Sequence, residues 1–185
     1  LEQIFQTLHG QKIKFLRIHT RTPIILPSRI DQGLTNLLKK YANKFTKIIF
    51  VLHVNHSSEI DTEVFSALEK LREIPIKKLT QSVLLKGIND NTEALIQLIY
   101  KVIDSDFSPY YLHHPDQVKG AMHFTLTLEE GRKVYQYLRN QVPGWALPHY
   151  IIDNANGMGK QLAFNPERIA YGGKMLDKNG VLQDY

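Results

Sequence analysis

The sequence predicts an α/β fold with parallel strands, and two observations support this prediction. Short apolar runs alternate four times with amphipathic stretches of helical length, which is typical of consecutive βαβ units. The apolar runs are almost continuous, as in "KIIFVL", and this favours strands of a parallel sheet that is covered by helices. With 43% hydrophobic and 22% charged residues, the 185-residue chain has the composition of a globular domain with a core.

Each predicted strand is followed by a predicted helix. The strands are expected at residues 12–20, 47–55, 79–87 and 107–114, and the helices at 29–44, 61–73, 91–105 and 127–141. In the third helix, one apolar face is formed by residues that keep a spacing of three and four: Ala94, Leu95, Leu98, Ile99, Val102 and Ile103. Asn91 and Thr127 are expected to cap helices, because an acidic first turn follows each of them.

The end of the chain has a different character. Residues 146–185 contain much of the glycine and asparagine and show no clear helical pattern. We therefore expect a parallel α/β part, either a barrel or an open sheet, over residues 1–145 and an irregular C-terminal extension over residues 146–185. The extension is expected to hold a glycine-rich loop, "DNANGMGK", that leads to Lys160, and a hairpin with its tight turn at Asn179-Gly180.

Composition excludes several classes of site and location. The absence of cysteine rules out disulfides, thiolate zinc sites and any iron–sulfur cluster with ligands from this chain. No apolar run approaches the roughly 20 residues of a membrane-spanning helix, and no export signal is visible, so a cytoplasmic protein without a membrane partner is expected. The net charge of +5 is scattered over predicted helices, which argues against nucleic-acid binding.

Polar side chains stand at the C-terminal ends of all four predicted strands. In a parallel barrel or open sheet, this edge is where ligands bind. The residues at these ends are Arg17, His19, Thr20, His53, Asn55, His56, Gln81, Ser82, Tyr110, His113, His114 and Asp116. The pattern predicts a ligand site along this edge.

One chemistry open to these residues is metal-dependent hydrolysis. The imidazoles of His53, His56, His113 and His114, with the carboxylate of Glu59 or Asp116, are the ligand types that zinc prefers. The spacing is not that of a helical zinc motif. Adjacent histidines on a strand also point to opposite faces, so at most one of His113 and His114 is expected to enter a site.

A second chemistry is covalent binding of a phosphorylated aldehyde cofactor. Pyridoxal phosphate needs a lysine that can move, and the glycine-rich segment before Lys160 would give that lysine freedom. Asp116 and Asp153 would then suit a cationic substrate, because two carboxylates hold an ammonium group in a desolvated pocket better than one.

Five segments, in this order, resemble the lysine 2,3-aminomutase family of radical S-adenosylmethionine enzymes, which also use pyridoxal phosphate. These segments are "FLRIHTRTPIILPSRI", "LHVNHSSEI", "QSVLLKGINDN", "PYYLHHPDQVKGAMHF" and "DNANGMGK". The resemblance extends from about residue 13 to residue 160. It is strongest to the branch that makes β-lysine for the modification of elongation factor P.

The resemblance implies a role for individual residues. Lys160 matches the lysine that holds pyridoxal phosphate, and Asp116 and Asp153 match the acids that bind the side-chain ammonium of substrate lysine. His53 and Gln81 match positions beside S-adenosylmethionine. The remaining matches are Thr20 and Arg21, which are expected to line the same cavity, and Tyr110, which is expected beside the pyridoxal ring. The implied reaction converts L-lysine to β-lysine by 2,3-migration of the amino group.

This sequence also departs from the family pattern. The family holds a [4Fe–4S] cluster with a three-cysteine loop, and this chain has no cysteine. We therefore expect the C-terminal part of a six-stranded partial barrel, inactive alone and self-associating through an exposed strand edge. His19 stands where glycine is usual, and Met158 is a further departure. The alternatives are a cysteine-less, non-catalytic ligand-binding relative and the metal-dependent hydrolase.

Overall fold

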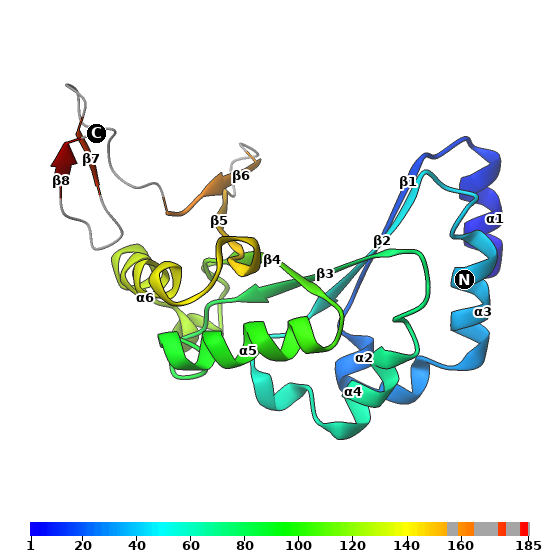
Figure 1. The fold of residues 1–185 in the computed structure, drawn as a ribbon, viewed down its shortest axis with the longest axis horizontal. Coiled ribbons are helices and arrows are strands. Elements are labelled where there is room, and N and C mark those ends of the chain that lie inside the picture. The colour runs from blue at the N-terminus through cyan, green and yellow to red at the C-terminus, as the bar shows by residue number, and fades with distance from the viewer. Residues whose placement is uncertain (155–158, 165–173, 177–181, 185) are drawn as a thin grey trace.

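The computed structural model describes residues 1–154, 159–164, 174–176 and 182–184, and helices cover one side of its main sheet (Figure 1). The strands of the six-stranded sheet are β1 (Phe15–Thr20), β2 (Lys47–His53), β3 (Lys77–Val83), β4 (Ser108–His113), β5 (His149–Asn154) and β6 (Gly159–Leu162). The α-helices are α1 (Glu2–Gly10), α2 (Thr22–Ile25), α3 (Gln32–Tyr41), α4 (Thr62–Glu69), α5 (Thr92–Asp104) and α6 (Leu128–Gln141). Single 3-10 turns lie at η1 (Pro27–Arg29), η2 (Ser57–Glu59), η3 (Met122–Phe124) and η4 (Gly144–Ala146).

The sheet is parallel from β1 to β5, and its strands are adjacent in the order in which they occur in the chain. Only β6 runs antiparallel, beside β5. Consecutive parallel strands with right-handed crossovers keep all connecting helices on one side, and the sheet then curls around its uncovered face. The predicted α/β fold and its partial-barrel form are confirmed.

All eight predicted strands and helices form, with shifted ends. The helix expected at 29–44 begins at Gln32, because η1 precedes it and the Asp31 side chain accepts a hydrogen bond from the Leu34 amide at 2.7 Å. The predicted caps of two other helices are also confirmed. Asn91 accepts from the Ala94 amide at 2.9 Å, and Thr127 forms a capping box with Glu130.

The predicted C-terminal extension contributes two strands to the main sheet. The chain after residue 145 was expected to be irregular, but β5 and β6 continue the sheet to Leu162. Lys160 accordingly lies on a strand, as the second residue of β6, while residues 155–158 of the predicted loop lie outside the described residues. Two short strands, β7 (Lys174–Leu176) and β8 (Leu182–Asp184), pair antiparallel, while the predicted Asn179-Gly180 turn and Met158 lie outside the described residues. The division at residue 145 into two domains stays a prediction.

Two apolar clusters fill the space between the sheet and its helices. The first lies under α1, α3 and α4 and has Leu38, Ile48 and Leu71 fully buried. The second lies under α5 and α6 and has Leu84 and Leu138 fully buried. Burial of these side chains is the main stabilising contribution, because it removes apolar surface from water. Within the described part of the chain, no helix is both long and apolar enough to cross a membrane.

Helix α6 lies close to β5 because residue 131 is a glycine. A Cβ atom at Gly131 would stand 2.0 Å from the hydroxyl oxygen of Tyr150, a distance that no packing tolerates. This close approach lets the buried Tyr150 hydroxyl meet Nδ1 of His114 at 2.7 Å. The hydrogen bond ties the end of β4 to β5, the strand that carries Asp153.

A buried polar network fixes the loops that follow β2 and β3. The Asn89 side chain is fully buried and donates to the carbonyls of Asn55 and Val83, at 2.7 and 2.9 Å. Its own oxygen accepts from the Leu85 amide at 2.6 Å. The Asn55 side chain in turn accepts from the Val83 amide at 2.9 Å. These bonds satisfy backbone groups where the strands end, so the C-terminal edge is held rigidly.

We predict that Asn89→Ala lowers the free energy of unfolding by about 3 kcal/mol, because the substitution leaves several buried backbone groups without a partner. Urea unfolding followed by circular dichroism measures this quantity. Asn36→Ala is the matched control, since Asn36 is exposed and its side chain accepts one hydrogen bond from Gln32, so a change within about 0.5 kcal/mol is expected. Equal losses in the two variants would show that the network does not stabilise the fold.

Candidate functional site

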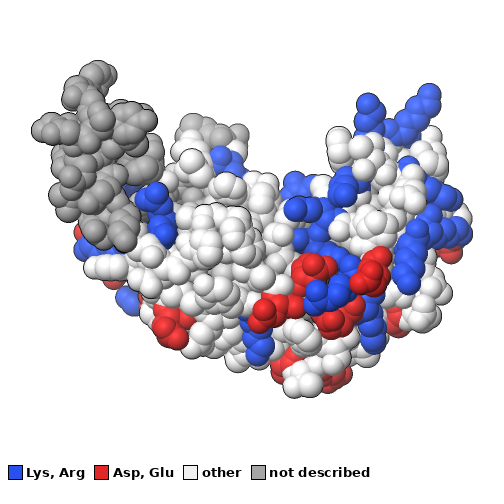
Figure 2. Space-filling model, in the orientation of Figure 1, with Lys and Arg blue, Asp and Glu red and all other residues white. Residues whose placement is uncertain are grey.

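The uncovered face of the sheet carries the polar residues that the strand-end pattern singled out. Side chains alternate between the faces of a strand, and those paired across parallel neighbours share a face. His53 pairs with Gln81, Gln81 pairs with Tyr111, and His113 pairs with Ile151, two residues before Asp153. Figure 2 shows that the molecule is hollowed on the side opposite α4 and α5.

A cavity of about 350 Å³ lies on this face, near the C-terminal ends of β1 to β5. Its size is at the lower end of the range for small-molecule sites. The residues that line it are Arg17, His19, His53, Gln81, Val83, Tyr111, His113, His114, Asp116, Asp153 and Lys160. Five of the eight residues predicted for the site are among them: Lys160, His53, Gln81, Asp116 and Asp153.

An ion pair between Lys160 and Asp153 lies at the centre of the site. The Lys160 ammonium is 2.6 Å from Oδ2 of Asp153, and both side chains are 40% exposed. The β5–β6 pairing produces this contact, because Asp153 and Lys160 face each other in the antiparallel register. Gly159, with φ of +71°, adopts the left-handed backbone conformation directly before the lysine, as glycine does readily.

His113 and Tyr111 complete the surroundings of this pair. Nδ1 of His113 lies 3.3 Å from the same Asp153 oxygen, and the Lys160 nitrogen is 5.6 Å from the centre of the Tyr111 ring. The hydrogen bond from Lys160 lowers the pKa of Asp153 below its ordinary value, so the carboxylate is ionised near neutral pH. Burial lowers the pKa of His113, with the charge of Lys160 as the next cause, so this imidazole is neutral.

Two histidines of the cavity each have a buried ring nitrogen without a partner among the described residues. Nε2 of His53 and Nε2 of His113 are buried, and neither has a hydrogen-bond partner within the described part of the chain. Burial lowers the pKa of His53, and the charge of Arg21 lowers it further. Buried polar atoms in a folded protein normally have partners, so these two nitrogens indicate a place for polar groups of a ligand.

Next to His53, the cavity is bounded by His19 and Gln81. A side-chain hydrogen bond joins these two residues, and burial together with the Arg17 charge lowers the pKa of His19. Arg17 also lines the cavity and lies close enough to Tyr111 to affect its pKa. On the β1 side the cavity therefore has the cationic Arg17, whereas Asp116 and Asp153 bring negative charge to the β4–β5 side.

Three predicted site residues lie elsewhere, and Tyr110 is the first of them. The tyrosine that lines the cavity is Tyr111. The β3–β4 register shifts after Thr80, so that Thr80 pairs with Pro109 but Gln81 pairs with Tyr111. Because of this irregularity, Tyr110 has no partner in the β3–β4 register, and Tyr111 faces the cavity. Tyr110 instead contacts Tyr111 with ring centres 3.9 Å apart and ring planes tilted by 36°, and its hydroxyl donates a 2.9 Å hydrogen bond to that of Tyr111.

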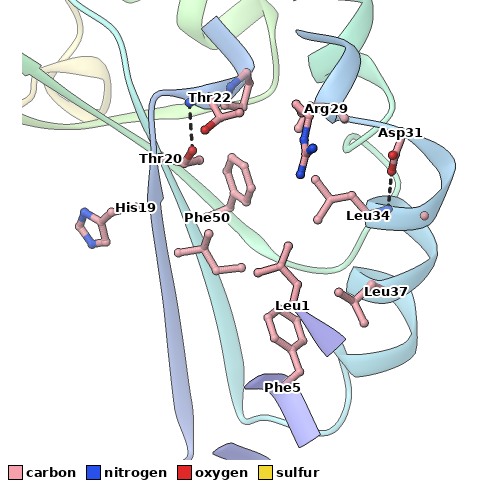
Figure 3. A pocket seen from close by; sticks show the side chains of 14 residues that line it. Leu1, Phe5, His19, Thr20, Thr22, Arg29, Asp31, Leu34, Leu37 and Phe50 are labelled. Atoms are coloured by element: carbon pink, nitrogen blue, oxygen red, sulfur yellow. Dashed lines mark hydrogen bonds between the residues drawn. The ribbon is translucent and has the colours of Figure 1, made fainter. Parts of the chain in front are cut away.

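Thr20 and Arg21 are the other two predicted site residues that do not line the cavity. Thr20 lines a separate apolar cavity of about 490 Å³ between β1 and α3, where its hydroxyl accepts from the Thr22 amide at 3.0 Å. Figure 3 shows that His19 points away from this cavity, so neighbouring residues of β1 serve opposite faces of the sheet. Arg21 forms an ion pair with Glu59, which also caps η2 through hydrogen bonds from the Asn55 and His56 amides.

The structure adds Arg17, His19, Tyr111 and His113 to the site residues predicted from the sequence. Arg17, His19 and His113 were visible as polar residues at strand ends, and strand alternation could have selected them. Tyr111 could not be selected in this way, because a bulge leaves no mark in the sequence. A bond between His113 and Asp153 joins two different strands, so it depends on the sheet register.

The geometry does not support the metal-site reading of the histidines. Among the described residues, no three His, Asp or Glu side chains converge as a metal site would require. His56 caps η2 and bonds to Ser58, while His114 bonds to Tyr150. His113 and His114 thus have separate partners, but both line the cavity, so the prediction that at most one of the pair enters the site is wrong.

No protein-family model matches the sequence, but curated proteins do. L-lysine 2,3-aminomutase of Escherichia coli K12 is 40% identical over 136 residues, which are 74% of this chain and 39% of that protein. The enzyme of the same name from Buchnera aphidicola is 41% identical over 142 residues, 77% of this chain and 41% of that protein. Glutamate 2,3-aminomutase of Clostridioides difficile is 34% identical over 80% of this chain and 34% of that protein.

A solved structure shares the fold. Streptococcus suis SuiB superposes with a TM-score of 0.54 at 15% identity, over 83% of this chain and 36% of SuiB, and one of its structures has S-adenosylmethionine bound. At this identity the likeness concerns the fold alone. This chain spans about two fifths of the length of the first two aminomutases above. The matched part of this chain belongs to the lysine 2,3-aminomutase family.

Proposed function

We propose that this chain forms part of a 2,3-aminomutase that converts L-lysine to β-lysine, with its amino-acid substrate bound between β4 and β5. The observation that carries the proposal is the group formed by Lys160, Asp153 and Asp116 in one cavity. A lysine nitrogen beside two carboxylates provides both a covalent attachment point and a receptor for a second ammonium group.

The two acids support lysine as the substrate, and sequence identity does not. Relatives named for lysine and for glutamate are both above 30% identical to this chain. Asp116 and Asp153 line the same cavity, and no ion pair of Asp116 is found among the described residues. Carboxylates attract the side-chain ammonium of lysine and repel the side-chain carboxylate of glutamate, so the charge of the site selects a cationic side chain.

The residues present fit pyridoxal phosphate. Lys160 presents its amine inside the cavity, Tyr111 offers a ring face beside it, and His53 and His113 offer buried nitrogens without partners in the described chain. Bound pyridoxal phosphate would supply a conjugated ring that delocalises charge or an unpaired electron next to the migrating nitrogen. Lys160 would hold it covalently, and Arg17 adds positive charge to a cavity that receives a phosphate group.

The fit to the other two implied cofactors differs. His53 and Gln81 face each other in the β2–β3 register and would contact S-adenosylmethionine. The residues of this chain do not fit a [4Fe–4S] cluster, because the sequence contains no cysteine to ligate it. We therefore assign no step of the reaction to a cluster held by this chain.

In this proposal, the chain binds the substrate and orients it. Asp153 and Asp116 hold the side-chain ammonium, and His113 donates its Nδ1 hydrogen to Asp153 and keeps the carboxylate facing the cavity. We further infer free lysine as the substrate, a link to elongation factor P, a homo-oligomer and a cytoplasmic location, all by resemblance.

A second candidate is a ligand-binding relative that does not catalyse amino migration. Such a relative would use the Lys160 and Asp153 pair to bind a ligand, without radical chemistry. This candidate would be supported if the purified, full-length natural protein contained no iron and still bound pyridoxal phosphate and lysine. Turnover of lysine to β-lysine by that protein would exclude it.

We predict that Lys160 is the residue that pyridoxal phosphate modifies. After borohydride reduction, mass spectrometry of tryptic peptides should find the pyridoxyl group on Lys160 in the wild type, and Lys160→Arg should remove it. Lys44→Arg is the control, because the Lys44 nitrogen also lies over a tyrosine ring, 4.7 Å from the centre of Tyr41, but outside the cavity. Equal labelling of Lys160→Arg and the wild type would refute the assignment.

We predict that Asp153→Asn and Asp116→Asn each weaken lysine binding about tenfold, since each removes a charge-assisted contact to an ammonium group. Isothermal titration calorimetry in the presence of pyridoxal phosphate gives the dissociation constants. Norleucine, which lacks the side-chain ammonium, should bind the two variants and the wild type alike. If lysine affinity is unchanged in both variants, these carboxylates do not form the ammonium site.

A further inference from the structure

The carboxylate assigned to the substrate already has a cation on it. Lys160 places its ammonium 2.6 Å from Oδ2 of Asp153, where the ammonium of a lysine substrate would bind. The contact follows from the pairing of β5 with β6 and does not need a ligand. Both side chains are 40% exposed, so the ion pair is weak enough to open.

We propose that Lys160 is an internal occupant of the ammonium site, so that the amino-acid substrate binds well only after an aldehyde cofactor has reacted with this lysine. This inference rests on the proposed function and extends it by fixing the order of binding. In the cofactor-free chain, Lys160 and the substrate compete for the same oxygen of Asp153. Covalent modification of Lys160 ends the competition.

The covalent step removes the charge that holds Lys160 on Asp153. The Lys160 ammonium first gives up a proton to water, and its Nζ then forms a carbon–nitrogen double bond with the aldehyde carbon of the cofactor. The aldehyde oxygen leaves as water, with the two remaining hydrogens of the amine. Nζ is then no longer an ammonium, and any hydrogen it keeps bonds to the neighbouring ring oxygen of the cofactor, so Asp153 is free to accept from another ammonium.

His113 lets Asp153 keep its place when Lys160 leaves. Its Nδ1 is 3.3 Å from the Asp153 oxygen that Lys160 uses, and its side chain is only 12% exposed. Because burial lowers the pKa of His113, the ring is neutral and carries one hydrogen, on the nitrogen that faces the carboxylate. A neutral donor orients Asp153 without cancelling its charge, which remains for the substrate. Asp116 also lines the cavity and adds a second negative charge.

Linkage makes this coupling reciprocal. If modification of Lys160 raises the affinity for lysine by some factor, bound lysine raises the affinity for the cofactor by the same factor. A substitution that removes the Lys160 charge should end the competition for Asp153 without any cofactor. Lys160→Met should therefore bind lysine more tightly than the wild type when pyridoxal phosphate is absent.

Isothermal titration of the chain with L-lysine, with and without saturating pyridoxal phosphate, tests the proposal. Without the cofactor, Lys160→Met is expected to bind lysine about fivefold more tightly than the wild type, a factor that corresponds to a partly exposed ion pair. The cofactor should raise the affinity of the wild type by a similar factor and leave that of Lys160→Met unchanged. Lys160→Gln is a second variant without the charge and should behave as Lys160→Met does.

Two controls separate competition from a general change in charge. Norleucine has no side-chain ammonium, so its affinity should be the same for the wild type and Lys160→Met. Lys44→Met removes a positive charge outside the cavity and should leave lysine binding unchanged. A second readout is the pKa of Asp153 by NMR, which should rise toward its ordinary value in Lys160→Met, because Lys160 lowers it in the wild type.

The outcomes distinguish this inference from the proposed function. Equal lysine affinity of the wild type, Lys160→Met and Lys160→Gln without cofactor would overturn the internal-occupant proposal, even if pyridoxal phosphate still modified Lys160. Tighter binding by these variants, with no modification of Lys160 in the wild type, would support the occupant and refute the cofactor assignment. If lysine bound to none of the proteins, both would fall.

Discussion

Parallel pairing of β1 to β5 is the constraint on which the rest of the structure depends. Parallel neighbours need crossover connections, and right-handed crossovers leave all the helices on one side of the sheet. The helix-facing side must then be apolar, as the buried Ile48 and Leu52 of β2 show. The other side remains free for polar residues, and the ends of five parallel strands meet at one edge. A site for small molecules at this edge is a consequence of that topology.

The polar edge is held in place by groups that never touch the cavity. Asn89 satisfies backbone groups after β2 and β3, close to His53 and Gln81. On the other side of the sheet, Gly131 lets Tyr150 reach His114 and so secures β4 against β5. Such support matters because charged groups bind strongly only when their positions are fixed before the ligand arrives.

In the proposed function, the Asp153 carboxylate binds two cations in turn: the Lys160 ammonium and the side-chain ammonium of the substrate. Asp153 pairs with Lys160 across the β5–β6 hairpin and accepts from the neutral His113 on the neighbouring strand. Under the proposed function, Lys160 competes with the ammonium group of the substrate for Asp153. Chemical modification of that lysine changes both the attachment of a cofactor and the charge available to a substrate. The contact between Lys160 and Asp153 thus connects cofactor attachment with substrate binding in the proposed function.

The sequence by itself determined the alternation of strands and helices, because apolar periodicity and capping residues such as Asn91 and Thr127 act locally. It also indicated Lys160, Asp153, Asp116, His53 and Gln81, through polar strand ends and a family resemblance. Only the tertiary structure decided that Tyr111 replaces Tyr110 in the cavity, since this depends on a register shift between β3 and β4. It alone placed Lys160 on β6, where hydrogen bonding to β5 sets the lysine against Asp153. Register between strands arises from contacts distant in sequence, and for this reason no local pattern records it.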